Sequence, residues 1–336
     1  MIQPASLDSH EGAVPSEEGY HVIKHTILWS AILLLLIAGS ARADSASRCE
    51  VHTEADPMLC TYEPNTIGYT LDSDDVAFMD FKLSLRYQLF PASITRAQND
   101  LHEGLGNESA IYFAFTGRFG QYIGTRESAP VVAKRFNPKL FYRYWTDNEH
   151  DSYVDFAFLA HESNGQSIDS AAEYQAALAT TKDQNAVNDQ ISRGWDYLEL
   201  VWKSKPLEIK DTRTMFGFLT FKYFLPYGPL EGRTEEYNSW ENSPQGKPRS
   251  HVNGIAGMIK FVEKGSWLVF RDMKAAALYE TGYREPFRFS TYRLELSTKS
   301  FQMPVTIWWQ TGYNSDLAQY YKKVYSRGIE VEIGSF

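Results

Sequence analysis

A histidine and a serine, His161 and Ser163, lie two residues apart where a stretch of alternating apolar residues gives way to a polar turn. Side chains at positions i and i+2 of a strand point to the same face. We therefore expect both to share a face with Asp155, Ala157 and Leu159 at the end of a strand. A histidine beside a serine on one face is the minimum for a hydroxyl nucleophile activated by a base.

A carboxylate that could orient the histidine follows on a later predicted strand. There Asp196 alternates in phase with Leu200 and Trp202, so turning this apolar face toward lipid places Asp196 outward with it. Antiparallel pairing of the two strands would bring Asp196 close to His161. This predicts Ser163 as nucleophile, His161 as general base and Asp196 as the orienting group. The alternative is a polar trio that merely meets lipid headgroups at a strand end.

Period-2 alternation recurs along the chain and predicts an all-β protein. Aromatic residues make up 15% of the sequence, and the predicted loops alternate roughly between short and long, as in outer-membrane barrels. We therefore predict a transmembrane antiparallel β-barrel of twelve strands; the alternative is a soluble sandwich whose polar faces meet solvent. An alanine-rich stretch, 169–188, predicts a short helix within a long loop. The expected strands are 81–89, 109–121, 139–146, 153–162, 193–203, 215–225, 252–263, 266–274, 275–283, 287–297, 302–312 and 325–335.

The N-terminal region predicts export. An apolar run, Ile27–Gly39, is too short to span a bilayer comfortably and precedes an A-x-A cleavage signal ending at Ala43. This favours a signal peptide cut before Asp44 over a retained anchor helix. We divide the chain into an N-terminal extension with signal peptide (1–43), an N-terminal periplasmic segment (44–75) and the barrel with the catalytic site on its outer face (76–336). The C-terminal Phe336 is the usual assembly mark of such barrels.

Charge and cysteine content narrow the function further. The chain carries a formal net charge of -9 and no basic block, which argues against a nucleic-acid partner. Its two cysteines, Cys49 and Cys60, follow the predicted cleavage site closely. In an oxidising compartment they favour a small structural disulfide over two free thiols.

Two motifs resemble those of the outer-membrane phospholipase A family. The stretch from His161 to Ser167, His-Glu-Ser-Asn-Gly-Gln-Ser, is similar to the family's His-Asp-Ser-Asn-Gly-Arg-Ser. Ser-Arg-Gly-Trp-Asp at 192–196 resembles the family's Ser-Arg-Ser-Trp-Asn. The resemblance implies a twelve-stranded outer-membrane barrel that hydrolyses sn-1 and sn-2 acyl esters of phospholipids and lysophospholipids. It also implies a requirement for calcium and activation by homodimerisation.

Carried over by position, the resemblance implies that Gly165 supplies an oxyanion-hole N–H. It places calcium on Ser128 from the partner subunit, on Gln166 through its backbone carbonyl, and on Ser192. Asp196 stands where the family usually has asparagine, and either side chain can accept the imidazole N–H. We therefore expect Asp196→Asn to retain substantial activity.

One insertion separates this chain from the family pattern. The family joins the positions of Ser167 and Ser192 by a few residues, whereas Ile168–Ile191 intervene here. The inserted loop and Asp196 keep open the alternative of a non-catalytic outer-membrane pore or binding barrel with a vestigial site.

Overall fold

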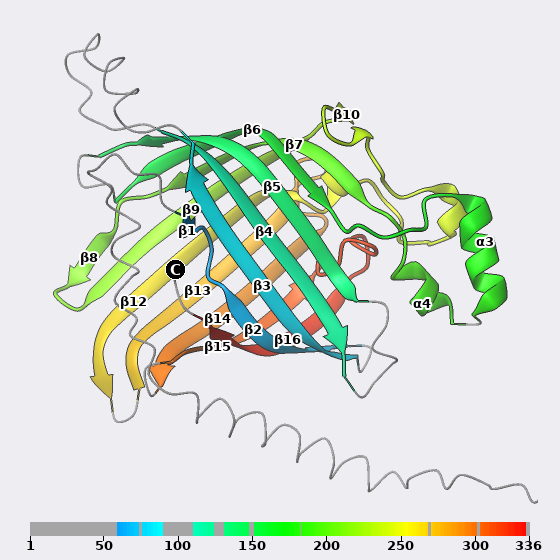
Figure 1. The fold of residues 1–336 in the computed structure, drawn as a ribbon. Coiled ribbons are helices and arrows are strands. Elements are labelled where there is room, and N and C mark those ends of the chain that lie inside the picture. Colours follow the sequence, from blue (N-terminus) through cyan, green and yellow to red (C-terminus); the bar gives the residue numbers. More distant parts are fainter. Residues whose placement is uncertain are drawn as a thin grey trace, which may run out of the picture. The chain divides into compact units, whose positions relative to one another are not determined.

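The strands form a closed antiparallel barrel (Figure 1). The computed structural model describes residues 59–73, 76–89, 110–123, 131–147, 151–181, 183–267, 270–300 and 303–333. They contain a fourteen-stranded sheet in which β3 pairs with both β2 and β4, so the ring closes. Two of the fourteen, β1 (Leu59–Thr61) and β8 (Leu207–Lys210), pair only with β3 and β9, which leaves twelve strands around the barrel. These are β2 (Thr66–Asp72), β3 (Ala77–Gln88), β4 (Ala110–Tyr122), β5 (Val132–Trp145), β6 (Tyr153–Ser163), β7 (Gly194–Lys203), β9 (Arg213–Phe224), β12 (Gly254–Trp267), β13 (Phe270–Gly282), β14 (Ser290–Ser300), β15 (Met303–Gly312) and β16 (Val324–Glu332).

The predicted strand number is confirmed, but two errors cancel within it. The stretch Thr66–Asp72 falls within the predicted periplasmic segment, yet β2 pairs with β3 and β16 as a barrel strand. The barrel boundary at residue 76 is therefore wrong. Conversely, a single strand, β13, stands where two are expected at 266–274 and 275–283, and residues 266–267 belong to β12. Its register shifts between Arg271 and Lys274, and this bulge broke the alternation that the prediction relied on.

The barrel wall separates an apolar outside from a charged inside. Large apolar side chains such as Phe156, Leu200 and Phe221 are exposed on the outer face. On the inner face, Lys139 and Glu199 form a buried ion pair at 2.6 Å. A second buried pair joins Arg143 to Asp155 at 2.6 Å. This distribution is that of a barrel whose outer face meets lipid.

Longer loops cover the end of the barrel where β6 finishes and β7 begins (Figure 1). One carries α3 (Ala171–Thr180) and α4 (Gln184–Asn188), which confirms the predicted helix within the inserted loop. The next carries β10 (Tyr227–Gly228), β11 (Gly232–Arg233) and the 3-10 turns η1 (Ser239–Glu241) and η2 (Arg249–His251). None of the helices in the described residues is long and apolar enough to cross a membrane.

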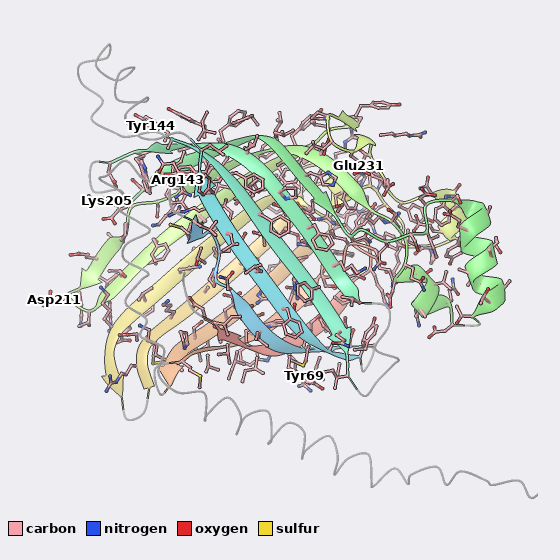
Figure 2. The ribbon with its side chains drawn as sticks, viewed as in Figure 1. Tyr69, Arg143, Tyr144, Lys205, Asp211 and Glu231 are labelled. Carbon is pink, nitrogen blue, oxygen red and sulfur yellow. The ribbon has the colours of Figure 1, made fainter. Side chains whose placement is uncertain are left out.

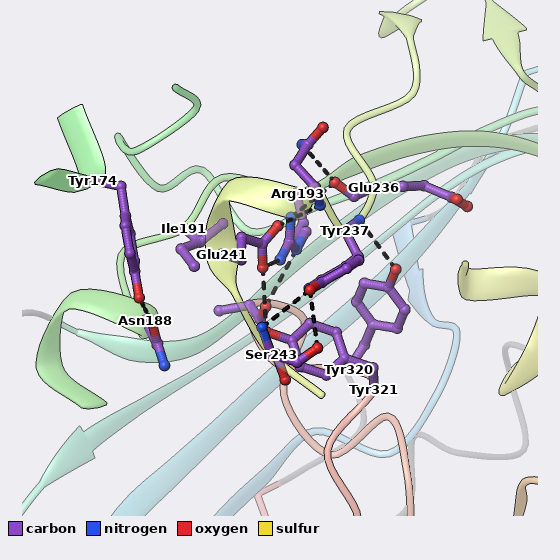
Figure 3. Close-up of polar contacts among 12 residues, drawn as sticks. Tyr174, Asn188, Ile191, Arg193, Glu236, Tyr237, Glu241, Ser243, Tyr320 and Tyr321 are labelled. Atoms are coloured by element: carbon purple, nitrogen blue, oxygen red, sulfur yellow. Dashed lines mark hydrogen bonds and ion pairs between the residues drawn. The ribbon is translucent and has the colours of Figure 1, made fainter. Parts of the chain in front are cut away.

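Polar contacts tie these loops together (Figure 3). Arg193 donates to the Glu241 carboxylate and to the Glu236 carbonyl, the latter at 3.1 Å. The Tyr321 hydroxyl donates to Glu241 at 3.2 Å, and the Tyr237 amide donates to the Tyr320 hydroxyl at 3.3 Å. The loops after β6, β9 and β15 therefore form one connected layer at this end of the barrel.

Several sequence predictions fall outside the described residues. They are the signal peptide and extension (1–43), Cys49, Ser128 and Phe336. Cys60 is described; it is buried and disulfide-bonded rather than a free thiol. Its pairing with Cys49 stays a prediction.

Candidate active site

The predicted histidine and carboxylate meet across two paired strands. His161 of β6 lies directly opposite Asp196 of β7 in the antiparallel register. Their side chains are joined by a hydrogen bond of 2.8 Å between His161 Nδ1 and an Asp196 carboxylate oxygen. The His161 side chain is 15% exposed and that of Asp196 only 1%. With Nδ1–H donating to Asp196, Nε2 is left as the nitrogen that can accept a proton.

The faces of β6 differ from the prediction in one respect. The register between β6 and β7 shifts between Ala157 and Ala160, so one extra residue reverses the alternation. Asp155 and Ala157 are buried inside the barrel, whereas His161 and Ser163 lie on the outward parity beyond the bulge. The predicted sharing of a face between the pair and Asp155 is therefore wrong, although His161 and Ser163 do share one.

Ser163 lies at the last position of β6, opposite Gly194. Its hydroxyl forms no hydrogen bond with any residue that the structure describes, His161 included. The turn that follows includes Gly165, whose φ of 57° lies in the left-handed region that favours glycine. The Gly165 N–H donates to no described residue, which leaves it available to an oxyanion.

A hairpin that the sequence did not predict holds the second oxygen of Asp196. This oxygen accepts hydrogen bonds from the backbone amides of Leu230 at 2.6 Å and Glu231 at 3.0 Å. A Cβ added at Gly228 would collide with the Asp196 side chain, so the hairpin backbone packs directly against the carboxylate. Glu231 also places a carboxylate oxygen 3.5 Å from His161 Nε2. Because every residue except proline has a backbone N–H, the sequence gives no indication of these donors. Gly228 is the one residue of the hairpin whose type is consistent with a close approach to Asp196.

The end of β6 is also fixed from inside the barrel. Glu162 points inward between the two outward-facing residues and is 1% exposed. Its carboxylate is paired with the fully buried Arg249 of η2 and lies 3.6 Å from both Arg135 and Lys222. Removing one partner of a buried ion pair is strongly destabilising, so this cluster anchors the strand that carries His161. The sequence does indicate this contact, because Glu162 alternates with the outward-facing His161 and Ser163 and must therefore point into the barrel.

The barrel architecture is shared with solved structures of outer-membrane proteins. The structure resembles outer-membrane phospholipase A from Escherichia coli with a TM-score of 0.55, 15% sequence identity, and coverage of 88% of this chain and 99% of that chain. It also resembles a Salmonella typhi outer-membrane phospholipase dimer with bound calcium, with a TM-score of 0.54, 16% identity and the same coverage. No family model matches the sequence, and no curated protein matches it either.

The fold is that of outer-membrane phospholipase A.

Within this phospholipase fold the inserted loop closes at its base. The Ile168 amide donates to the Gln190 carbonyl at 2.9 Å, and the Ser192 amide donates to the Ile168 carbonyl at 2.8 Å. The Asn164 side chain accepts from the Arg193 amide at 2.9 Å and donates to the Ile191 carbonyl at 2.7 Å. The inserted segment packs around its own apolar cluster. Its two ends are held together by backbone hydrogen bonds, so the positions that flank it lie as close as they would across a short loop. That cluster is Ile168, Tyr174, Val187 and Ile191.

Two of the positions that the resemblance assigns to calcium, Gln166 and Ser192, are described, and both present oxygen atoms. The Gln166 carbonyl accepts no hydrogen bond from any described residue. The Ser192 hydroxyl donates to the Glu235 carboxylate at 2.6 Å, so carboxylate oxygens lie beside it. These are the hard oxygen donors that calcium prefers. Ser128, the third predicted ligand, lies outside the described residues.

Proposed function

We propose that this chain is a calcium-dependent outer-membrane phospholipase A that hydrolyses acyl esters of phospholipids and lysophospholipids. The observation that carries the proposal is the 2.8 Å hydrogen bond between His161 Nδ1 and the buried Asp196. His161 lies two residues from Ser163, and both occupy outward-facing positions of a barrel whose outer face is apolar. The ester bond of a lipid that contacts this outer face would reach Ser163 without the lipid leaving the membrane.

The residues act in sequence. The Ser163 hydroxyl attacks the ester carbonyl carbon while His161 Nε2 takes its proton, and Asp196 stabilises the resulting imidazolium through Nδ1–H. The oxyanion formed is stabilised by the Gly165 N–H. His161 then returns the proton to the leaving alcohol, which leaves an acyl group on Ser163. Water activated by His161 hydrolyses that ester and releases the fatty acid.

Calcium would be held by the Gln166 carbonyl and the Ser192 hydroxyl, with Glu235 adjacent to Ser192. Bound there, it would add positive charge beside the oxyanion. With Ser128 contributed from the second subunit of a homodimer, the metal site would be complete only in the dimer.

The rival reading, a pore or binding barrel with a vestigial site, is less well supported. Oppositely charged side chains form buried ion pairs inside the barrel, among them Lys139–Glu199 and Arg143–Asp155. Charged side chains that are buried from solvent are unlike the lining of a water-filled channel. In addition, the intact contact between His161 and Asp196 has no role in a pore.

The test is phospholipid hydrolysis by the purified barrel in detergent with calcium, then with chelator. We expect activity with calcium, its loss with chelator, and its loss in Ser163→Ala while the folded barrel persists. Hydrolysis near the parent level in Ser163→Ala would remove Ser163 from the nucleophile role.

A further inference from the structure

Glu231, labelled in Figure 2, lies between β10 and β11 and places its carboxyl group near His161. One oxygen lies 3.5 Å from His161 Nε2, the nitrogen that must take the serine proton. The same carboxyl group occupies the space that a Cβ on Gly194 would fill. Because Gly194 is the cross-strand partner of Ser163, the Glu231 carboxyl group occupies the position across the strand pair from Ser163.

The backbone of Glu231 is fixed, so this position is not that of a freely moving loop. Its amide donates to Asp196 at 3.0 Å, and the preceding amide of Leu230 donates to the same oxygen at 2.6 Å. The strands β10 and β11 pair at either side of the turn. The Glu231 side chain is 16% exposed. The hairpin that positions the Asp196 carboxylate therefore also delivers a second carboxyl group to the other nitrogen of the same histidine.

Carboxyl groups at both ring nitrogens favour the imidazolium form, which donates from both. A general base needs Nε2 unprotonated, so an ionised Glu231 opposes activation of Ser163. Burial raises the pKa of the Glu231 carboxyl, and the neighbouring Glu235 and Asp196 carboxylates act in the same direction, whereas His161 lowers it. Displacement of the Glu231 carboxyl group would free Nε2.

We propose that Glu231 is a positioning residue that competes with Ser163 for His161 Nε2 and thereby holds the serine in a weakly activated state. This inference rests on the proposed function for the role of Ser163. The hairpin 227–233 would then orient Asp196 and also restrain His161 as the general base.

The test measures the reactivity of His161 directly. Diethyl pyrocarbonate acylates an unprotonated imidazole nitrogen, and mass spectrometry of the peptide containing His161 follows its rate across a pH series. Glu231→Ala removes the carboxyl group but keeps the backbone amide that binds Asp196. Tyr227→Ala is the matched control, because that side chain belongs to the same hairpin and is 74% exposed. Glu231→Gln keeps the side-chain volume and serves if the alanine variant does not fold.

We expect Glu231→Ala to accelerate modification of His161 about two- to fivefold near neutral pH, the factor that corresponds to a partly exposed ion pair. Labelling of Ser163 by a fluorophosphonate should accelerate in parallel, while Tyr227→Ala matches the parent. Unchanged rates at His161 in both Glu231 variants would overturn the proposal. Full lipid hydrolysis by Ser163→Ala would instead overturn the proposed function and leave the His161 result standing.

Discussion

We predict that Asp196→Asn loses most of its activity, because the carboxylate accepts hydrogen bonds from two directions. One oxygen accepts from His161 Nδ1 at 2.8 Å, and the other accepts from the Leu230 and Glu231 amides at 2.6 and 3.0 Å. An asparagine has one acceptor oxygen and one NH2 donor. The contact with His161 alone predicts that Asp196→Asn retains substantial activity, whereas the two hairpin amides predict a large loss of activity.

Both orientations of the amide are unfavourable. With its oxygen on His161, the amide NH2 faces two backbone donors and leaves them without an acceptor, at about 1–3 kcal/mol for each buried unsatisfied group. With its oxygen on the hairpin, the NH2 donates to Nδ1, which puts the histidine proton on Nε2 and removes the general base. A loss of about 3 kcal/mol corresponds to roughly a 100-fold fall in kcat.

The assay is phospholipid hydrolysis in detergent with saturating calcium, comparing Asp196→Asn with Asp196→Ala. The control is Asp211→Asn, the same substitution at an exposed residue by the opposite end of the barrel (Figure 2). Gly228→Ala provides an independent perturbation, because its Cβ would collide with Asp196. We expect Gly228→Ala to lower kcat as well, without unfolding the barrel. Activity of Asp196→Asn within a few-fold of the parent would refute the argument from the two backbone donors.

The remaining predictions concern the buried carboxylate of Glu162, the carboxyl group of Asp316 in the loop after β15, and calcium. Glu162→Ala should destabilise the barrel by about 3–5 kcal/mol, since it leaves the fully buried Arg249 unpaired; urea unfolding followed by heat-modified gel mobility measures this, and an unchanged midpoint would contradict it. Burial raises the pKa of Asp316 to about 6, so its folded-state pKa exceeds the unfolded value of 3.8 and stability should fall as pH rises from about 4 through 6. Asp316→Asn should therefore stabilise the protein by on the order of 2 kcal/mol at pH 7 and by little at pH 4, after allowance for the partial exposure of this residue; equal effects at both pH values would refute this. Calcium should favour the dimer by about 1–3 kcal/mol if Ser128 reaches the site from the second subunit; sedimentation with calcium and with chelator tests this, and a dimer fraction indifferent to calcium would argue against a shared site.

The sequence alone determined the features that depend on local periodicity and composition. Alternating side chains predicted a twelve-stranded barrel with an apolar outside, as found. The spacing of His161 and Ser163 predicted a shared face, and antiparallel pairing predicted the approach of Asp196, which the register confirms. These predictions succeed because a strand has a fixed period of two, and pairing of its neighbours follows from connectivity.

Only the tertiary structure decided the contacts that depend on irregular backbone and on distant loops. A bulge between Ala157 and Ala160 set which face His161 occupies, and one extra residue leaves no mark on composition. The amides that fix Asp196 and the carboxyl group of Glu231 come from a hairpin more than thirty residues away, 34 and 35 positions along the chain. Backbone N–H groups are the same in every residue except proline, so no residue type announces where a loop will place them.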